Sequence, residues 1–428
     1  MSRYWLALIV FVFSPLHTHA SENLQSIYQT AKQVDPQFKS AEATYLADQE
    51  LAVQAQSGYY PNINFSANTG KNWYESPKPD IISKGYSIDL KQPLYRRSTY
   101  VTNRQAKAEV KRAGINFSAA RQALIIRVAN AYFDTLAAQD NLQFSQAEKA
   151  AIERQLEQTK QRFDVGLIAI TDVHESQAAF DNAKATEIVA ENRLAIARLA
   201  LQEIINQSVN IIAPLADNMP LQQPEPNDPT YWLALAKDNN KELTALAQTL
   251  AISEQAVKLA RAGHHPTLDL NASHRYSDDN FSSFVGNRST SISLQLNVPL
   301  YQGGQTQSKV RQAQHQLTAA KEQYEQQRRA VERQVRSAFL DVTAAISQVR
   351  ALQQALISSQ SALEASEAGL EVGTRTTVDV LNTRRELYRA KSNLAQAKYS
   401  FIISTLTLKQ AAGALDEEDI STVNRWLR

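Results

Sequence analysis

Two short segments place polar side chains at the same spacing after a Val-Gly pair. They read RFDVGLIAITDV at 162–173 and GLEVGTRTTVDV at 369–380. Each carries an aspartate near its end, Asp172 or Asp379, and the second also has Arg375 between the glycine and the aspartate. An arginine can bind a carboxylate through two hydrogen bonds, and clustered carboxylates attract cations. The chemistry open to these residues is therefore ion pairing or cation binding.

Each of these residues also has a simpler possible role. Asp172 is followed by Glu175 at the spacing of a helix-capping arrangement. Asp379 could be an acid in a first helical turn, where the helix dipole favours it. Arg375, in a turn, could be a solvated surface charge. The residue types alone leave both kinds of role open.

Catalytic signatures are missing from the sequence. The chain has no cysteine, and the histidines at 174, 264, 265, 274 and 315 lack HExxH spacing. There is no GxSxG motif and no glycine-rich phosphate loop. Net charge is +2 with acids and bases interspersed, which is not a nucleic-acid footprint. We therefore predict a protein that is not an enzyme, needs no cofactor or metal, and does not bind nucleic acid.

The first 20 residues have the pattern of a secretory signal peptide. Arg3 precedes an apolar run from Tyr4 to Phe13, and Ala20 stands before Ser21. The run is too short to span a membrane as a helix, although an N-terminal anchor is the alternative. No other apolar run reaches 18 residues, so we predict an exported chain without a transmembrane helix.

The two polar segments belong to a repeat of about 200 residues. QPLY at 92–95 matches VPLY at 298–301, and SGYYPNINF at 57–65 matches AGHHPTLDL at 262–270. This period far exceeds the roughly 20–50 residues of solenoid repeats. We expect two copies of a large unit, a proline-rich linker between them, and a polar, peripheral tail. Their ranges are 21–207 and 229–413 for the copies, 208–228 for the linker and 414–428 for the tail.

Long helices dominate each copy. We expect helices of about 35 residues at Leu24–Ser57 and Pro229–Ala262. Much longer stretches, Tyr100–Phe163 and Thr306–Leu370, should each turn into a second long helix. At 1.5 Å per residue these stretches would span on the order of 100 Å, which requires partner helices. A heptad seam supports such packing and consists of Val335, Phe339, Val342, Ile346 and Val349.

Each copy also has two segments in which apolar and polar side chains alternate, near 62–68, 86–91, 268–273 and 291–298. The alternation fits strands of an outer-membrane barrel as well as strands of an ordinary half-buried sheet. Four strands cannot close a barrel, because known barrels need about eight or more. An exported protein with only four would share one barrel among subunits.

The mature chain resembles the TolC family of trimeric outer-membrane channel-tunnels, from ENLQSIYQTAKQVDPQF (22–38) to LYRAKSNLAQAKYSFI (387–402). The most specific segments are QRFDVGLIAITDV (161–173) and VGTRTTVDVL (372–381). The resemblance implies a mainly α fold with a membrane β part. Long antiparallel helices would form a trimeric periplasmic tunnel, with the linker in a belt around it, and three chains would share a 12-stranded barrel.

The resemblance also implies a function and partners. The trimer would be an outer-membrane channel of a Gram-negative bacterium that passively conducts drugs, other small molecules or secreted proteins. An inner-membrane transporter, docked through a periplasmic adaptor, would supply the energy. The sequence does not specify the cargo or the identity of these partners.

The resemblance also implies which residues form the gate, because the gate positions of the family can be matched to residues of this chain. Arg375 of the second turn would bond to Thr171 and Asp172 of the first turn and latch the closed gate. Gln155 and Glu367 are weaker candidates for a contact between the hairpins. Asp379 would form a ring of carboxylates at the pore constriction.

The chain departs from the family pattern at two places. Leu370 stands where a tyrosine is expected, which removes one gate hydrogen bond. Asn382, one turn beyond Asp379, replaces a second aspartate of the constriction. A single acidic ring should bind multivalent cations more weakly than two stacked rings. We therefore predict weaker block of channel current by such cations than in a homologue with two rings.

A periplasmic coiled-coil adaptor, or another structural interaction protein, is the alternative function. The signal peptide and the heptads fit an adaptor equally well. Two copies of a hairpin combined with amphipathic strands do not, since an adaptor has no need of them.

Overall fold

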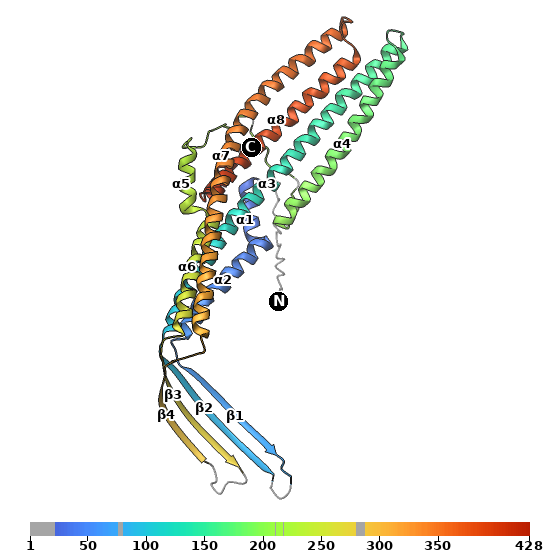
Figure 1. The fold of residues 1–428 in the computed structure, drawn as a ribbon. Coiled ribbons are helices and arrows are strands. Elements are labelled where there is room, and N and C mark those ends of the chain that lie inside the picture. Colours follow the sequence, from blue (N-terminus) through green and yellow to red (C-terminus); the bar gives the residue numbers. More distant parts are fainter. Residues whose placement is uncertain (1–21, 76–79, 210, 217, 280–286) are drawn as a thin grey trace, which may run out of the picture.

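The computed structural model describes residues 22–75, 80–209, 211–216, 218–279 and 287–428, so the expected signal peptide lies outside the described residues. The molecule is elongated, with a four-stranded sheet at one end and the turns of two long hairpins at the other (Figure 1). Each half of the chain contributes two shorter helices, two strands and one hairpin in the same order. The repeat in the sequence is thus a repeat in the fold.

Four long helices form the two hairpins. The first hairpin consists of α3 (Arg97–Asp164) and α4 (Ile170–Ile205), and the second of α7 (Gln305–Glu371) and α8 (Thr377–Ala411). The predicted heptad seam of α7 is buried along its whole length. Helix α8 also packs against α3, which places the hairpins side by side (Figure 1). Within the described residues, none of the helices combines the length and the apolar character needed to cross a bilayer.

The two expected helices of about 35 residues are each divided in two, so that prediction was wrong. In the first half α1 (Leu24–Val34) and α2 (Pro36–Ser57) meet at Asp35, whose carboxylate accepts from Phe38 N at 2.6 Å. Pro36 cannot donate a helical hydrogen bond and disfavours a helical conformation at residue 35.

The second half repeats this break without a proline. Helices α5 (Pro229–Asn239) and α6 (Lys241–Ala262) meet at Asn240, whose side chain accepts from Leu243 N at 3.0 Å. The same side chain donates to Ala411 O at 2.9 Å. Asn240 therefore caps α6 and also bonds to the last residue of α8. These two bonds stabilise the break that Pro36 favours in the first half.

The four strands form one antiparallel sheet in chain order. They are β1 (Asn62–Asn72), β2 (Ile81–Arg96), β3 (Thr267–Asp279) and β4 (Asn287–Asn297). The pairing of β2 with β3 joins the two halves of the chain. Because Phe65 pairs with Ile88, and Ala272 with Ile292, the predicted apolar positions gather on one face. The predicted strand segments are confirmed.

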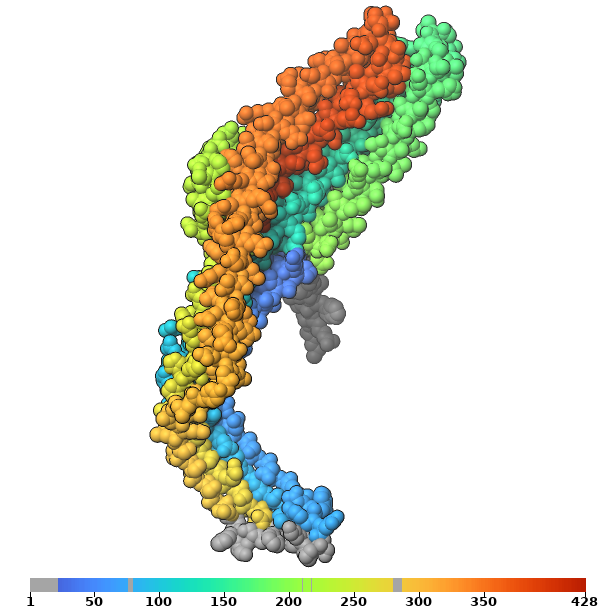
Figure 2. Space-filling view, in the orientation of Figure 1, coloured from blue at the N-terminus to red at the C-terminus, as the bar shows by residue number. Residues whose placement is uncertain are grey.

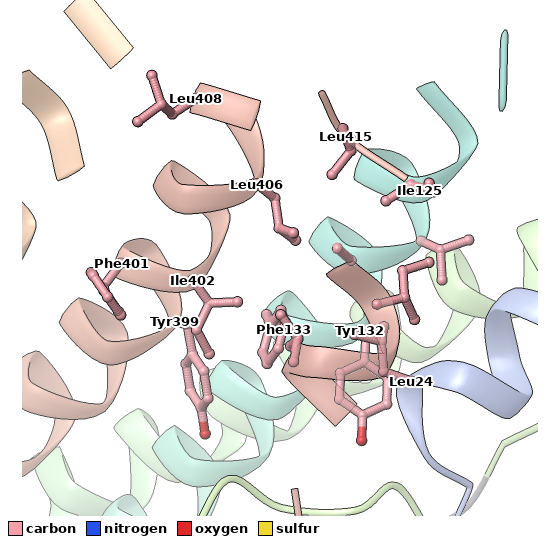
Figure 3. Close-up of a cluster of buried hydrophobic side chains, with 14 of the residues drawn as sticks. Leu24, Ile125, Tyr132, Phe133, Tyr399, Phe401, Ile402, Leu406, Leu408 and Leu415 are labelled. Carbon is pink, nitrogen blue, oxygen red and sulfur yellow. The ribbon is translucent and has the colours of Figure 1, made fainter. Parts of the chain in front are cut away.

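The main hydrophobic core lies where α1 and the C-terminal segment meet the middle of the hairpins (Figure 3). Tyr132 of α3 is fully buried there and donates to Ala213 O of the linker at 2.7 Å. The tail was expected to be peripheral, which is wrong. It contains α9 (Glu417–Asn424), and its apolar side chains Leu415, Ile420 and Val423 are buried in this core.

Candidate gate at the hairpin turns

The turns of both hairpins close in the same way. A glycine in the left-handed conformation follows the first helix of each, Gly166 at φ 74° and Gly373 at φ 78°. In the first turn Leu167 N donates to Arg162 O at 2.9 Å, and the second turn repeats this bond at 2.8 Å. This is the Schellman arrangement, which glycine enters with least strain. The glycine of the Val-Gly pair therefore recurs because the backbone of each turn needs a residue in the left-handed conformation.

The helices after the two turns begin differently. Thr376 is the N-cap of α8: its hydroxyl accepts from Asp379 N at 3.2 Å, and the Asp379 carboxylate accepts from Thr376 N at 2.9 Å. Helix α4 begins after Ala169, which has no side-chain oxygen, and no side-chain capping bond forms there. The interpretation of Asp172 as a cap is therefore wrong, and the capping box lies at Asp379.

The capping box also affects the titration of Asp379. Hydrogen bonds from the backbone amide and the hydroxyl of Thr376, with a smaller contribution from Arg375, hold the pKa of the Asp379 carboxyl below its ordinary value. The carboxylate, which is partly exposed to water, therefore stays negative to a lower pH than an ordinary aspartate does. Asn382, about one helical turn further on, is exposed and neutral. Of these two positions only Asp379 carries charge.

Arg375 is exposed and leans back over the end of α7. Its Cγ lies 2.6 Å from the point where a Cβ on Gly369 would stand, so a larger residue there would displace the arginine. Among the described residues of one chain, Arg375 forms no hydrogen bond or ion pair with Thr171 or Asp172. Thr171 is exposed and Asp172 is partly exposed. A bond between these groups therefore has to be made between chains or after a movement of the turns.

The ion pair nearest the second turn involves a residue that the sequence did not single out. Arg384 of α8 donates from Nη2 to Glu367 Oε1 of α7 at 2.6 Å and from Nη1 to Ala151 O of α3 at 3.2 Å. Glu367 thus reaches the other hairpin through Arg384, while no hydrogen bond joins it to Gln155 within the described part of one chain. Ala151 is 233 residues from Arg384, and no local pattern could indicate such a contact.

Leu370 takes part in apolar packing at the end of α7. It lies against a small buried cluster formed by Leu363, Val380 and Leu387. Leu370 has no side-chain hydrogen-bonding group, so its contribution near the turn is apolar contact.

The outer ends of the hairpins are apolar as well as charged. Leu167 is 73% exposed and Val372 is 75% exposed, one at each turn. Figure 2 shows the two hairpin ends standing next to each other at the end of the molecule remote from the sheet. Each turn of one chain thus presents an apolar side chain to solvent.

Comparisons with known proteins assign this architecture. A family described as "Outer membrane efflux protein" matches residues 27–207 and 232–414. Outer membrane protein TolC of Vibrio cholerae is 41% identical over 98% of both chains, and the alkaline protease secretion protein AprF of Pseudomonas aeruginosa is 28% identical over 92% of this chain and 85% of its own length. The solved outer membrane protein VceC from Vibrio cholerae superposes with a TM-score of 0.78 at 18% identity, covering 91% of this chain and 96% of VceC.

These matches span both halves of the fold, from the strands to the hairpin turns. They favour the channel over the periplasmic adaptor, because the matching proteins are outer-membrane proteins. The chain therefore belongs to the outer membrane efflux protein family, the TolC-like channels through which Gram-negative bacteria export molecules across the outer membrane.

Proposed function

We propose that three copies of the chain assemble into one channel with a shared barrel of 12 strands. The observation that carries the proposal is the pair of edges on the sheet. Strands β1 and β4 are its first and last strands, and every residue of both is exposed in one chain. A strand edge inside a bilayer must be paired. Pairing β4 of one copy with β1 of the next satisfies all edges when the ring closes.

The apolar face of the sheet supports contact with lipid. Phe65 of β1 and Ile292 and Leu294 of β4 are among the most exposed large apolar side chains of the molecule. The opposite face carries asparagine and serine side chains, such as Asn64 and Ser291, and would line the water-filled interior. This division of the two faces is the one that a membrane barrel requires.

The gate of the proposed channel lies at the hairpin turns. Arg375 would bind Thr171 and Asp172 of a neighbouring copy; within the described part of one chain these residues form no such bond. Gln155 and Glu367 would face each other across the same boundary. Three copies of Asp379 would form the constriction, with Asn382 adding no charge to it. Breaking a few ion pairs suffices to open such a gate if the two packings differ by only a few kcal/mol.

The partners in this proposal are a periplasmic adaptor and an inner-membrane transporter. The exposed Leu167 and Val372 at the turns give the adaptor an apolar surface to contact. The cargo would include drugs and other small molecules. The similarity to AprF, a protein named for protease secretion, extends the cargo to secreted proteins.

The experiment that tests the proposal uses the absence of cysteine from the chain. Pairs of cysteines, one in β1 and one in β4, should yield covalent trimers on oxidation in the outer membrane. The purified protein should also conduct ions in planar bilayers. Cysteines at Leu167 and Thr374 should be crosslinked to an adaptor in cells. Monomers recovered from the periplasmic fraction, without conductance, would contradict the channel.

A further inference from the structure

We infer that Arg384 is a second latch of the gate, which holds the two hairpins of each chain together in the closed channel. The inference rests on the proposed function, because it concerns a channel that opens when its hairpins move. The two latches would lie at different positions in the channel. Arg375 would join neighbouring chains at the turns, whereas Arg384 joins three helices of one chain about two helical turns into α8.

The contacts of Arg384 cross from one hairpin to the other. The guanidinium extends from α8, pairs with Glu367 of α7 at 2.6 Å, and donates to the backbone oxygen of Ala151 in α3 at 3.2 Å. The pair with Glu367 lies within the second hairpin and fixes the direction of the guanidinium. The bond to Ala151 is the one that reaches the first hairpin. A planar guanidinium suits this task, since its donors point in fixed directions to two acceptors at once.

The surroundings make the bond to Ala151 costly to break. The side chain of Arg384 is only 12% exposed. Ile152, next to Ala151, packs with Leu381 of α8 in a small apolar cluster. Polar contacts beside such a cluster are less screened by water, and a charge that loses its acceptor there is left poorly solvated. Any movement that separates α8 from α3 therefore has to break this bond.

Arg389 provides a contrast on the same helix. It pairs with Glu386 at 3.0 Å, but Glu386 is three residues away on α8 itself, and the Arg389 side chain is 63% exposed. An ion pair within one helix cannot resist movement between helices. Arg384 and Arg389 thus differ in whether a hydrogen bond crosses between the hairpins, since the Arg389 charge acts on Glu148 of α3 only through space.

The test measures single-channel currents of purified protein in planar bilayers. The Arg384→Gln variant should raise the open probability of the mostly closed channel by about tenfold, the factor that corresponds to the loss of one hydrogen bond to a charged group. Arg389→Gln, which removes no hydrogen bond between the hairpins, should change the open probability much less than Arg384→Gln does. Arg384→Lys should fall in between, because an ammonium can keep the pair with Glu367 but does not reproduce the two-sided geometry.

A covalent replacement separates a latch from a merely structural role. In an Ala151→Cys, Arg384→Cys double variant the channel should open more often. A short bis-methanethiosulfonate, which forms a disulfide with each cysteine and releases sulfinate, should close it again until reductant is added. An open probability of Arg384→Gln equal to that of the unsubstituted protein would overturn the inference, as would a loss of thermal stability without a change in current. Absence of current from the unsubstituted protein would instead overturn the proposed channel.

Discussion

At the scale of single residues, the two aspartates of the hairpin turns show how one neighbour changes a role. Asp172 and Asp379 occupy equivalent positions in the repeat. Thr376 gives α8 a hydroxyl cap that binds the Asp379 backbone and holds its carboxylate, whereas Ala169 leaves the Asp172 carboxylate without that partner. The first acid is thus available for a bond outside its own helix. The second is oriented by its own helix start.

The capping box at Asp379 predicts how block of the channel current by cations depends on pH. A carboxyl whose pKa is lowered in the folded protein stays charged, and its stabilising bonds persist, until the pH falls through that lowered pKa. In planar bilayers, block of the current by a trivalent cation should therefore persist into acid for the unsubstituted protein. In Thr376→Ala the pKa of Asp379 rises toward its ordinary value, and block should be lost at a higher pH.

Two controls accompany this titration. Asp379→Asn should abolish the pH-dependent part of the block, and Asn382→Asp should strengthen the block at neutral pH by adding a second ring. Identical midpoints for Thr376→Ala and the unsubstituted protein would show that the cap does not affect the titration of Asp379 at the proposed constriction.

At the scale of elements, breaks and ends of helices hold the halves of the chain together. The break between α5 and α6 lies against the end of α8, where Asn240 binds Ala411 O. Gly413 follows α8 with φ 74°, and a Cβ on it would stand 2.2 Å from Asn239 O. The end of α8 and the α5–α6 junction therefore fit only when residue 413 has no side chain.

Gly413→Ala should be strongly destabilising. The backbone strain and the collision with a backbone oxygen should together lower the free energy of unfolding by more than about 3 kcal/mol. Gly303→Ala is the matched control: its φ is 59°, but nothing lies within 4 Å of its Cβ, so only about 1 kcal/mol of strain is expected. Thermal unfolding of both variants in detergent measures the difference, and equal midpoints would contradict the collision.

The positions of the long helices could be predicted from the sequence. The longest helices, α3 and α7, begin and end within a few residues of the predicted bounds, because their interiors have no proline and only one glycine each, Gly114 and Gly369. The break at Asn240 was missed, since its second partner, Ala411, is 171 residues away. Arg384 was missed for the same reason. Its acceptor in the first hairpin is a backbone oxygen, which the types of the residues do not reveal.

At the scale of the whole molecule, the two faces of the sheet have opposite requirements. The face with Phe65 and Leu294 is apolar and exposed in one chain, and in the proposed barrel it meets lipid. The opposite face is polar and meets water. Substitutions at neighbouring positions of one strand should therefore have very different effects on assembly.

Leu294→Arg and Ser293→Arg form a matched pair in β4. Leu294 is 67% exposed on the apolar face, and a charge there should cost about 2–4 kcal/mol if it lies near the bilayer midplane, so few trimers should assemble in the outer membrane. Ser293 pairs with Asn271 on the polar face, and its arginine variant should assemble normally. The amount of heat-resistant trimer in the outer-membrane fraction is the readout. Equal amounts would show that the face of Leu294 does not contact lipid.

The pairing of β2 with β3 has a consequence for assembly kinetics. Those strands come from different halves of one chain, so their join forms within a molecule and does not depend on protein concentration. A ring of single-repeat units would need six copies to meet, whereas the proposed ring needs three. The yield of complete barrels should then rise with the third power of the concentration of the chain instead of the sixth. Linking the halves thus allows the proposed closed channel to form at a lower chain concentration than six separate units would need.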